Sequence, residues 1–148
     1  FYDTTIVEND IWSTEYFNKV LQAPGDLGNK MHAAFDTLFQ KGYNHCVVVG
    51  SDLFDLKASI IENAFKALQN NDAVVGPAED GGYYLLGLNQ STPAVFNNKD
   101  WGTATVFNAT TNDLKKVKVQ LLETLNDIDT FEDLERSGYN INFKEQLL

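Results

Sequence analysis

The sequence predicts an α/β fold, a three-layer sandwich in which helices cover both faces of a mostly parallel, mixed sheet. Short apolar runs typical of buried strands alternate with longer stretches in which apolar residues recur at helical spacing. Alternation of this kind places parallel strands side by side and helices on the two faces of the sheet. With 148 residues, 43% of them hydrophobic and 22% charged, the chain has the size and composition of one domain over residues 1–148.

The N-terminal third contains one helix with clear boundaries. A short strand is predicted over residues 3–7, and residues 12–21 fit either a loop or a short helix. Apolar residues then recur every three or four positions from 27 to 39, which predicts an amphipathic helix. Asp26 is the expected N-cap of this helix, and Gly42 is its expected stop.

The central third supplies most of the predicted sheet. The apolar run over residues 45–50 is too short for a helix and predicts a buried strand. A helix follows, with its apolar stripe between positions 60 and 68. Two further strands are predicted over residues 73–75, which a Gly-Pro pair closes, and over residues 83–88, which are rich in aromatic and branched side chains.

The C-terminal third repeats the alternation of helix and strand. Thr103 is expected to cap a helix that runs to about Asp113, and residues 117–122 read as another strand. Asp129, with a glutamate three places further on, resembles a capping box and predicts the start of a last helix, which Gly138 ends.

Charge and composition exclude several classes of partner. The formal net charge is −10, and the densest basic cluster holds only three lysines, so we expect no binding to nucleic acid or to an anionic membrane. No apolar segment approaches the ~20 residues of a membrane span. Cys46 is the only cysteine and cannot form an intramolecular disulfide, so we expect a cytoplasmic protein.

The first residue is a phenylalanine, and the zones of a signal peptide are absent from the sequence. We therefore expect that an N-terminal part of the protein is missing. A sheet edge left open by a missing strand would favour a homo-oligomer.

The strand over residues 45–50 leads directly into Ser51 and Asp52, and Asp55 follows three places later. Ligands of open α/β sheets bind outside the carboxyl ends of the strands, so a carboxylate here is placed to hold a metal or a polar substrate. Mg²⁺ and Mn²⁺ prefer hard oxygen ligands and need only one or two protein carboxylates beside phosphate oxygens. The alternative is that Asp52 or Asp55 caps the next helix.

Two more acidic clusters stand between predicted elements. In the first, Glu79 and Asp80 precede Gly81 and Gly82, whose backbone permits the close approach of a ligand. The alternative is an ordinary turn between two strands. The second cluster holds Asp127 and Asp129; for it the alternative is the helix cap described above, which does not exclude a metal contact.

Trp101 is a further candidate, because an indole ring can stack on a base or on the face of a sugar. Packing is the alternative for this side chain. His32 and His45 lack the spacing of a zinc site, and Cys46 lies within a predicted strand, where a core role is favoured over a nucleophilic one.

Four sequence motifs, taken in their order along the chain, resemble those of one protein family. This family is the transferase 1 proteins associated with radical-SAM/selenodomain systems. The motifs read VVVGSDLFDL, GPAEDGGYYLLGL, WGTATVF and LNDIDTFEDL, and the resemblance runs from about Gly25 to Leu134, which is most of the chain. These proteins are similar to the wider nucleotide-diphospho-sugar transferase superfamily, which has the GT-A fold and includes glycosyltransferases and nucleotidyltransferases. The resemblance therefore implies the GT-A fold and a transferase.

Carried over residue by residue, the resemblance makes Asp52 the metal carboxylate after the central strand. The usual SDCPDL pattern is altered here in its middle pair, while Asp52 and Asp55 are retained. Asp129 would be a second metal ligand, with Asp127 as its alternative. The superfamily's N-terminal strand and basic, glycine-containing loop have no counterpart in the sequence.

The same resemblance implies that residues 78–82 line the acceptor or sugar pocket. We therefore expect Asp52 and Asp80 to be catalytic, with a second group of residues contacting the substrate. That group is Ser51, Asp55, Glu79, Gly81, Gly82 and Trp101.

The function predicted on these grounds is glycosyl or nucleotidyl transfer. The substrates would be a nucleoside triphosphate or nucleotide sugar and a small-molecule acceptor, with Mg²⁺ or Mn²⁺ as cofactor. A non-catalytic accessory module that binds a nucleotide or sugar is the alternative. An aspartyl phosphohydrolase is less favoured, because its second Asp commonly lies two residues after the first, whereas Asp55 lies three residues after Asp52.

Overall fold

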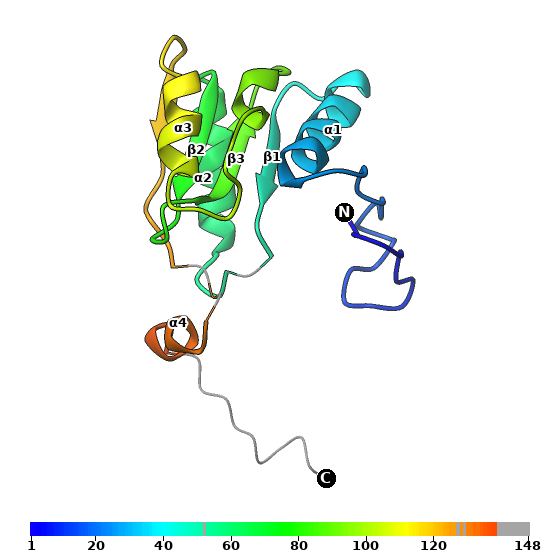
Figure 1. Ribbon diagram of the computed structural model, residues 1–148. Coiled ribbons are helices and arrows are strands. Elements are labelled where there is room, and N and C mark those ends of the chain that lie inside the picture. The colour runs from blue at the N-terminus through cyan, green and yellow to red at the C-terminus, as the bar shows by residue number, and fades with distance from the viewer. Residues whose placement is uncertain (52, 127, 129, 139–148) are drawn as a thin grey trace.

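The computed structural model describes residues 1–51, 53–126, 128 and 130–138 (Figure 1). A four-stranded sheet in the order β1-β3-β2-β4 forms the middle layer of the described part. Its strands are β1 (Cys46–Val49), β2 (Ala73–Pro77), β3 (Tyr83–Leu88) and β4 (Val119–Leu121). The helical elements are α1 (Leu27–Gln40), α2 (Ala58–Leu68), the 3₁₀ turn η1 (Pro93–Phe96), α3 (Val106–Asp113) and α4 (Phe131–Arg136).

The sheet is mixed, as predicted, and three of its four described strands run in one direction. β1, β2 and β4 point the same way, and β3 lies antiparallel between β1 and β2. The short turn between β2 and β3 explains this reversal, because a parallel pair needs a crossover connection of a dozen or more residues. The carboxyl ends of β1, β2 and β4 therefore share one edge of the sheet with the beginning of β3.

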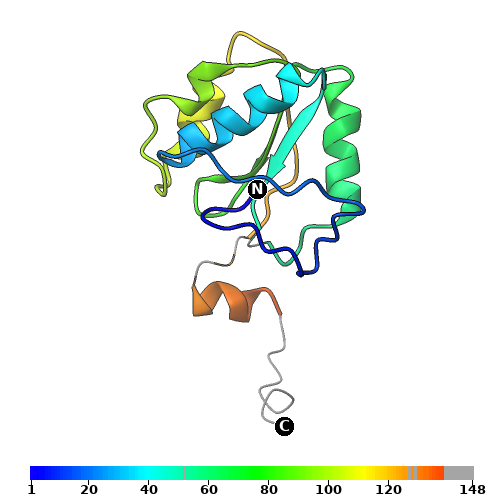
Figure 2. The same cartoon turned by 90° about the vertical axis from the view of Figure 1, so that its right-hand side faces the viewer.

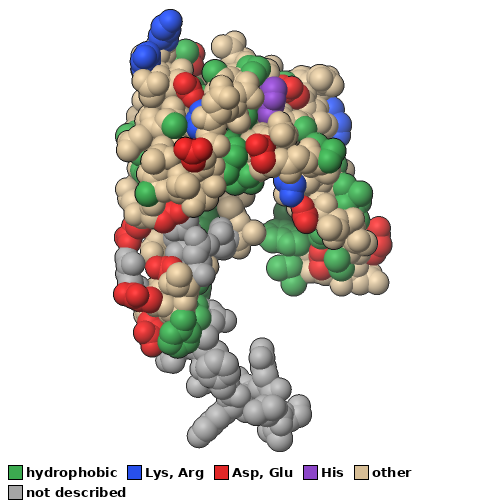
Figure 3. All heavy atoms as spheres, viewed as in Figure 1, with side chains coloured by type: hydrophobic (Ala, Val, Ile, Leu, Met, Phe, Trp, Pro, Cys, Tyr) green, Lys and Arg blue, Asp and Glu red, His purple; other side chains and the backbone are tan. Residues whose placement is uncertain are grey.

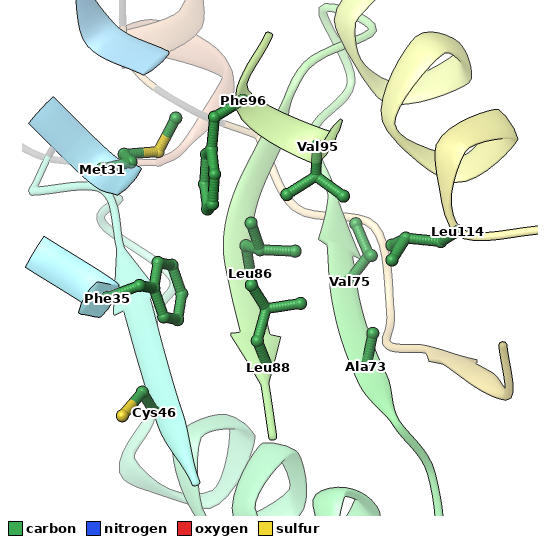
Figure 4. Packing of buried hydrophobic residues seen from close by; sticks show 10 residues of the cluster. All are labelled: Met31, Phe35, Cys46, Ala73, Val75, Leu86, Leu88, Val95, Phe96 and Leu114. Carbon is green, nitrogen blue, oxygen red and sulfur yellow. The ribbon is translucent and has the colours of Figure 1, made fainter. Parts of the chain in front are cut away.

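Two apolar clusters hold the three layers together. On one face, α1, η1 and α3 cover a core that includes Phe35, Leu86 and Phe96 (Figure 4). On the other face, α2 packs Ala64 and Leu68 against the sheet. Helices on both faces explain why the strands read as nearly continuous apolar runs. The predicted α/β class and three-layer arrangement are confirmed.

The N-cap of α1 is the predicted residue, whereas the N-caps of α2 and α3 differ from the prediction. Asp26 caps α1, with its carboxylate accepting the N–H of Asn29 at 2.8 Å. The N-cap residue of α2 is Lys57, so the capping alternative for Asp52 and Asp55 is wrong.

Helix α3 begins at Val106, and its N-cap residue is Thr105. The prediction that Thr103 caps this helix is therefore wrong. The Thr103 hydroxyl instead donates to the Asp100 carbonyl at 2.7 Å. Thr103 is thereby engaged within the loop that precedes the helix.

The N-terminal segment, residues 1–25, is irregular, and the predicted strand over its described residues 3–7 is wrong. An isolated bridge joins Tyr2 to Leu21 instead. The Lys19 ammonium, whose side chain is only 4% exposed, donates to the carbonyls of Val7 and Glu8 and to the Asp10 carboxylate. These contacts fold the segment back on itself. Figure 3 shows hydrophobic and acidic side chains side by side on its surface.

We expect acid to loosen this segment. Hydrogen bonds from Lys19 and Tyr2 lower the pKa of Asp10 from 3.8 to about 2. A carboxyl with a depressed pKa stabilises the folded form above its ordinary pKa and loses that contribution as pH falls through the lowered value. The segment should therefore be ordered above ~pH 4 and loosen as the pH falls toward 2.

Trp12 reports this change, because its backbone N–H donates to Asp10 at 2.9 Å. Fluorescence in a Trp101→Phe variant, which leaves Trp12 as the only tryptophan, measures it. An Asp10→Asn variant should lack the transition. Identical acid titrations of the two proteins would show that Asp10 does not order the segment.

Among the described helices, none combines the length and apolar character that crossing a membrane requires.

Candidate functional site

A pocket of about 380 Å³ opens at the carboxyl end of β1. Four parts of the fold line it: the first half of α1, residues 48–51 at the end of β1, the β2–β3 turn, and residues 101–106 before and at the start of α3. Phe1 and Gln22 of the N-terminal segment complete the lining, and Figure 2 shows this segment passing the end of β1. The pocket thus occupies the edge of the sheet at which the sequence predicts a ligand.

Some of the predicted site residues meet in this pocket and others do not. Those that line it are Ser51, Asp80, Gly82 and Trp101. Those that belong to described parts of the chain but are not in the lining are Asp55, Glu79 and Gly81. The predicted metal residues Asp52, Asp127 and Asp129 lie outside the described residues.

The β2–β3 turn holds Asp80 in place. The N–H of Gly82 donates to Asp80 Oδ1 at 2.7 Å, which fixes the carboxylate on its own turn. Gly81 adopts φ +92°, and a Cβ built on it would lie 2.5 Å from the Ala104 carbonyl oxygen. Its carbonyl accepts the N–H of Phe107 at 3.0 Å. The segment is therefore a turn, as the alternative held, and it also packs on the loop that carries Trp101.

Trp101 packs into the wall of the pocket. Its ring lies edge-on to Tyr83, with centroids 6.5 Å apart and an interplanar angle of 82°. The indole also approaches the backbone of Gly28 in α1. Trp101 thus packs against the core, as the alternative held, and the same indole lines the pocket, so its role in stacking stays a prediction.

The residues that precede Asp52 and Asp127 in the sequence lie at the same edge of the sheet. The Gly50 N–H, two residues before Asp52, donates to the Tyr84 carbonyl at 2.9 Å. Leu125, two residues before Asp127, bridges to Ala78 at the end of β2. Within the described residues, no three His, Cys, Asp or Glu side chains are grouped as a metal site.

Several lining residues were not predicted from the sequence. Lys30 forms an ion pair with Asp3, and Met31 receives the Tyr83 hydroxyl at 3.8 Å from its sulfur. Burial raises the pKa of the Tyr83 phenol, which therefore stays protonated in the pocket wall. Tyr83 directly follows the Gly81–Gly82 pair, a proximity that offered the one sequence signal for it.

The start of α4 also corrects the sequence prediction. Its capping box consists of Thr130 and Asp133, one residue later than the predicted pair of Asp129 and Glu132. The Thr130 hydroxyl accepts the N–H of Asp133, and the Asp133 carboxylate accepts the N–H of Thr130 at 2.9 Å. The capping alternative for Asp129 is therefore wrong.

We expect Thr130→Ala to destabilise α4 by ~1 kcal/mol, the usual cost of a lost cap. Asp129→Ala should leave the helix unchanged, since the cap lies at the next residue. Hydrogen exchange of the α4 amides measures both effects. Greater loss of protection in Asp129→Ala than in Thr130→Ala would contradict this assignment of the cap.

A model of the family described as "Uncharacterized protein conserved in bacteria", DUF2064, matches residues 3–103. Among solved structures, the chain is similar to a "putative nucleotide-diphospho-sugar transferase" from Desulfovibrio desulfuricans G20, with 36% sequence identity and a TM-score of 0.76. The match covers 84% of this chain and 57% of that chain. Comparison with curated proteins found no significant match.

Proposed function

Because the chain belongs to the DUF2064 family and has a fold like that of a nucleotide-diphospho-sugar transferase, we propose that it serves glycosyl or nucleotidyl transfer. The donor would be a nucleoside triphosphate or nucleotide sugar, and the acceptor a small molecule. Within the superfamily, we assign the chain to the radical-SAM/selenodomain-associated transferase 1 proteins on its four motifs. The chain spans only 57% of the similar transferase, so activity is proposed for the protein as a whole.

The observation that carries the proposal is the position of the pocket. It lies outside the carboxyl end of β1, and residues of the β2–β3 turn line it as well. In open α/β sheets this is the place where ligands bind. Ser51 and Asp80 reach the same pocket from segments that are far apart in the sequence.

Asp52, with Asp127 or Asp129, would hold Mg²⁺ or Mn²⁺. The donors suit a hard cation, because these three side chains are carboxylates and neither histidine nor cysteine occurs in the described lining of the pocket. A bound cation would neutralise charge that develops on the phosphate leaving group.

Asp80 is the only carboxylate among the described residues that line the pocket. We assign it the role of accepting the proton of the acceptor hydroxyl. Its Oδ1 is already engaged by Gly82, which orients the group and leaves Oδ2 for the acceptor. The hydroxyl of Ser51, a residue that lines the same pocket, can donate a hydrogen bond to the substrate.

Thermal shift of the purified protein tests the proposal. The protein is heated with nucleoside triphosphates and nucleotide sugars, in the presence and absence of Mg²⁺ or Mn²⁺. Metal-dependent stabilisation by one nucleotide is the expected result, and a ligand at 100 times its Kd should add ~2.7 kcal/mol to the free energy of unfolding. Stabilisation by a nucleoside triphosphate or nucleotide sugar without any requirement for metal would favour the non-catalytic module. No stabilisation by any of these ligands would reject both functions.

A further inference from the structure

We propose that the pocket binds the acceptor and that Trp101, seated by Gly28, selects an uncharged or cationic acceptor with a flat apolar ring face and a hydroxyl group. This inference rests on the proposed function, since it names the acceptor class of that same site. It makes Gly28 a positioning residue for Trp101.

Gly28 allows the indole of Trp101 to lie directly on the backbone of α1. A Cβ at this position would fall 2.8 Å from Trp101 Nε1, 2.9 Å from Trp101 Cζ2 and 2.4 Å from the Phe96 carbonyl oxygen. Separations under 3.0 Å force atoms to move, and the backbone oxygen of Phe96 cannot turn aside as a flexible side chain would. The absence of a side chain on Gly28 therefore leaves the room that Trp101 occupies against α1.

Besides Gly28, the aromatic ring of Tyr83 also contacts Trp101 and holds it in place. Tyr83 meets it edge-on, and the Tyr83 hydroxyl is itself directed to the sulfur of Met31. Trp101 is therefore held between α1 and β3 as a rigid part of the wall. Leu27, Met31 and Val48 add apolar surface to the same lining.

The polar groups of the pocket specify the rest of the acceptor. Asp80 supplies a carboxylate that can accept a hydrogen bond from a hydroxyl group. Lys30 is the only lysine or arginine among the described lining residues, and its ion pair with Asp3 offsets its charge. An anionic acceptor would therefore meet the uncompensated charge of Asp80.

A flat apolar face can come from two sources. In a pyranose the axial C–H groups form such a face, and in an aromatic compound the ring itself forms it. Both can rest against a fixed indole while a hydroxyl reaches Asp80. The experiment therefore includes both kinds of ring.

Fluorescence titration of a Trp12→Phe variant measures ring binding, because Trp101 is then the only tryptophan. The probes are methyl β-D-glucopyranoside, benzyl alcohol and, as the anionic match to the alcohol, benzoate. A saturable change in Trp101 emission with the glucoside identifies a pyranose acceptor, and one with benzyl alcohol identifies an aromatic acceptor. No saturable change with either, or a response to benzoate as strong as the better of the two, would overturn the inference.

Calorimetry on two matched variants separates binding from folding. Trp101→Leu should weaken the binding of the responding probe at least tenfold, whereas Trp12→Leu, in the N-terminal segment outside the pocket lining, should leave it unchanged. Gly28→Ala should shift Trp101 emission to the red and weaken binding if it folds. Equal affinities for Trp101→Leu and Trp12→Leu would refute the role of Trp101 whether or not Gly28→Ala folds.

These titrations contain neither metal nor nucleotide, so they are independent of the transfer reaction. Intact ring binding in a protein that shows no metal-dependent nucleotide stabilisation would reject the proposed function and leave a ring-binding pocket. Intact nucleotide stabilisation without ring binding would reject only the acceptor class.

Discussion

Asp52→Asn is expected to lower metal-dependent transfer strongly while the fold is retained. Loss of the carboxylate removes a metal ligand, and loss of one such electrostatic contact costs roughly 10²- to 10³-fold in turnover. The N-cap of α2 is Lys57, so no helix cap is lost with Asp52. The free energy of unfolding without metal should therefore change little.

Turnover with Mg²⁺ or Mn²⁺ and denaturant unfolding of the same preparations measure the two effects. Glu62→Gln is the matched control, because it makes the same carboxylate-to-amide change on α2 at a side chain that is 67% exposed and outside the pocket lining. This control should keep its turnover. Unchanged turnover in Asp52→Asn would remove Asp52 from the metal site.

Local patterns in the sequence were sufficient to predict most helices and strands. The helix over α1 shows its apolar spacing, its Asp26 cap and its terminal glycine within one continuous stretch. Capping positions were less predictable, since both Thr103 and Thr105, and both Asp129 and Thr130, are favoured cap residues by type. Which one is used depends on the direction from which the chain enters the helix.

The direction of β3 shows a second limit. The alternation of helices and strands predicts parallel neighbours, but β3 follows β2 after a short turn and pairs with it and with β1 in antiparallel register. Residues 3–7 have strand-like composition, but contacts of Lys19 with Val7 and Glu8 hold this region in a loop. Tertiary contacts of this kind outweigh weak local preferences for strand.

Part of the site was predictable, because the sequence shows where strands begin and end. Ser51, Asp80 and Gly82 stand at the ends or beginnings of strands, and strand ends that share one edge bring their neighbours together. Gly28 and Met31 lie within α1, where the sequence pattern shows only a helix face. Met31 lines the pocket and Gly28 contacts Trp101 because of the way α1 packs against η1 and Trp101, which no local sequence pattern shows.

Gly81→Ala is expected to destabilise the protein strongly and to disrupt the pocket. The residue has φ +92°, a conformation that costs an L-residue roughly 1–2 kcal/mol. The new Cβ would also lie 2.5 Å from the Ala104 carbonyl oxygen and 2.7 Å from the Ala104 Cα, so backbone must move. Overpacking of this kind adds ~1–3 kcal/mol, which gives a total loss of about 2–5 kcal/mol in the free energy of unfolding.

Gly42→Ala provides the control for the backbone cost alone. Gly42 has nearly the same conformation, with φ +89°, but an added Cβ there meets nothing within 4 Å. Its loss should be only the backbone cost of roughly 1–2 kcal/mol. Urea unfolding of the two variants gives the difference, which measures how firmly the β2–β3 turn is pressed against the loop that carries Trp101. Equal losses for the two variants would mean that the turn can move away from Ala104 at little cost, and Asp80 would then not be held in the pocket by that contact.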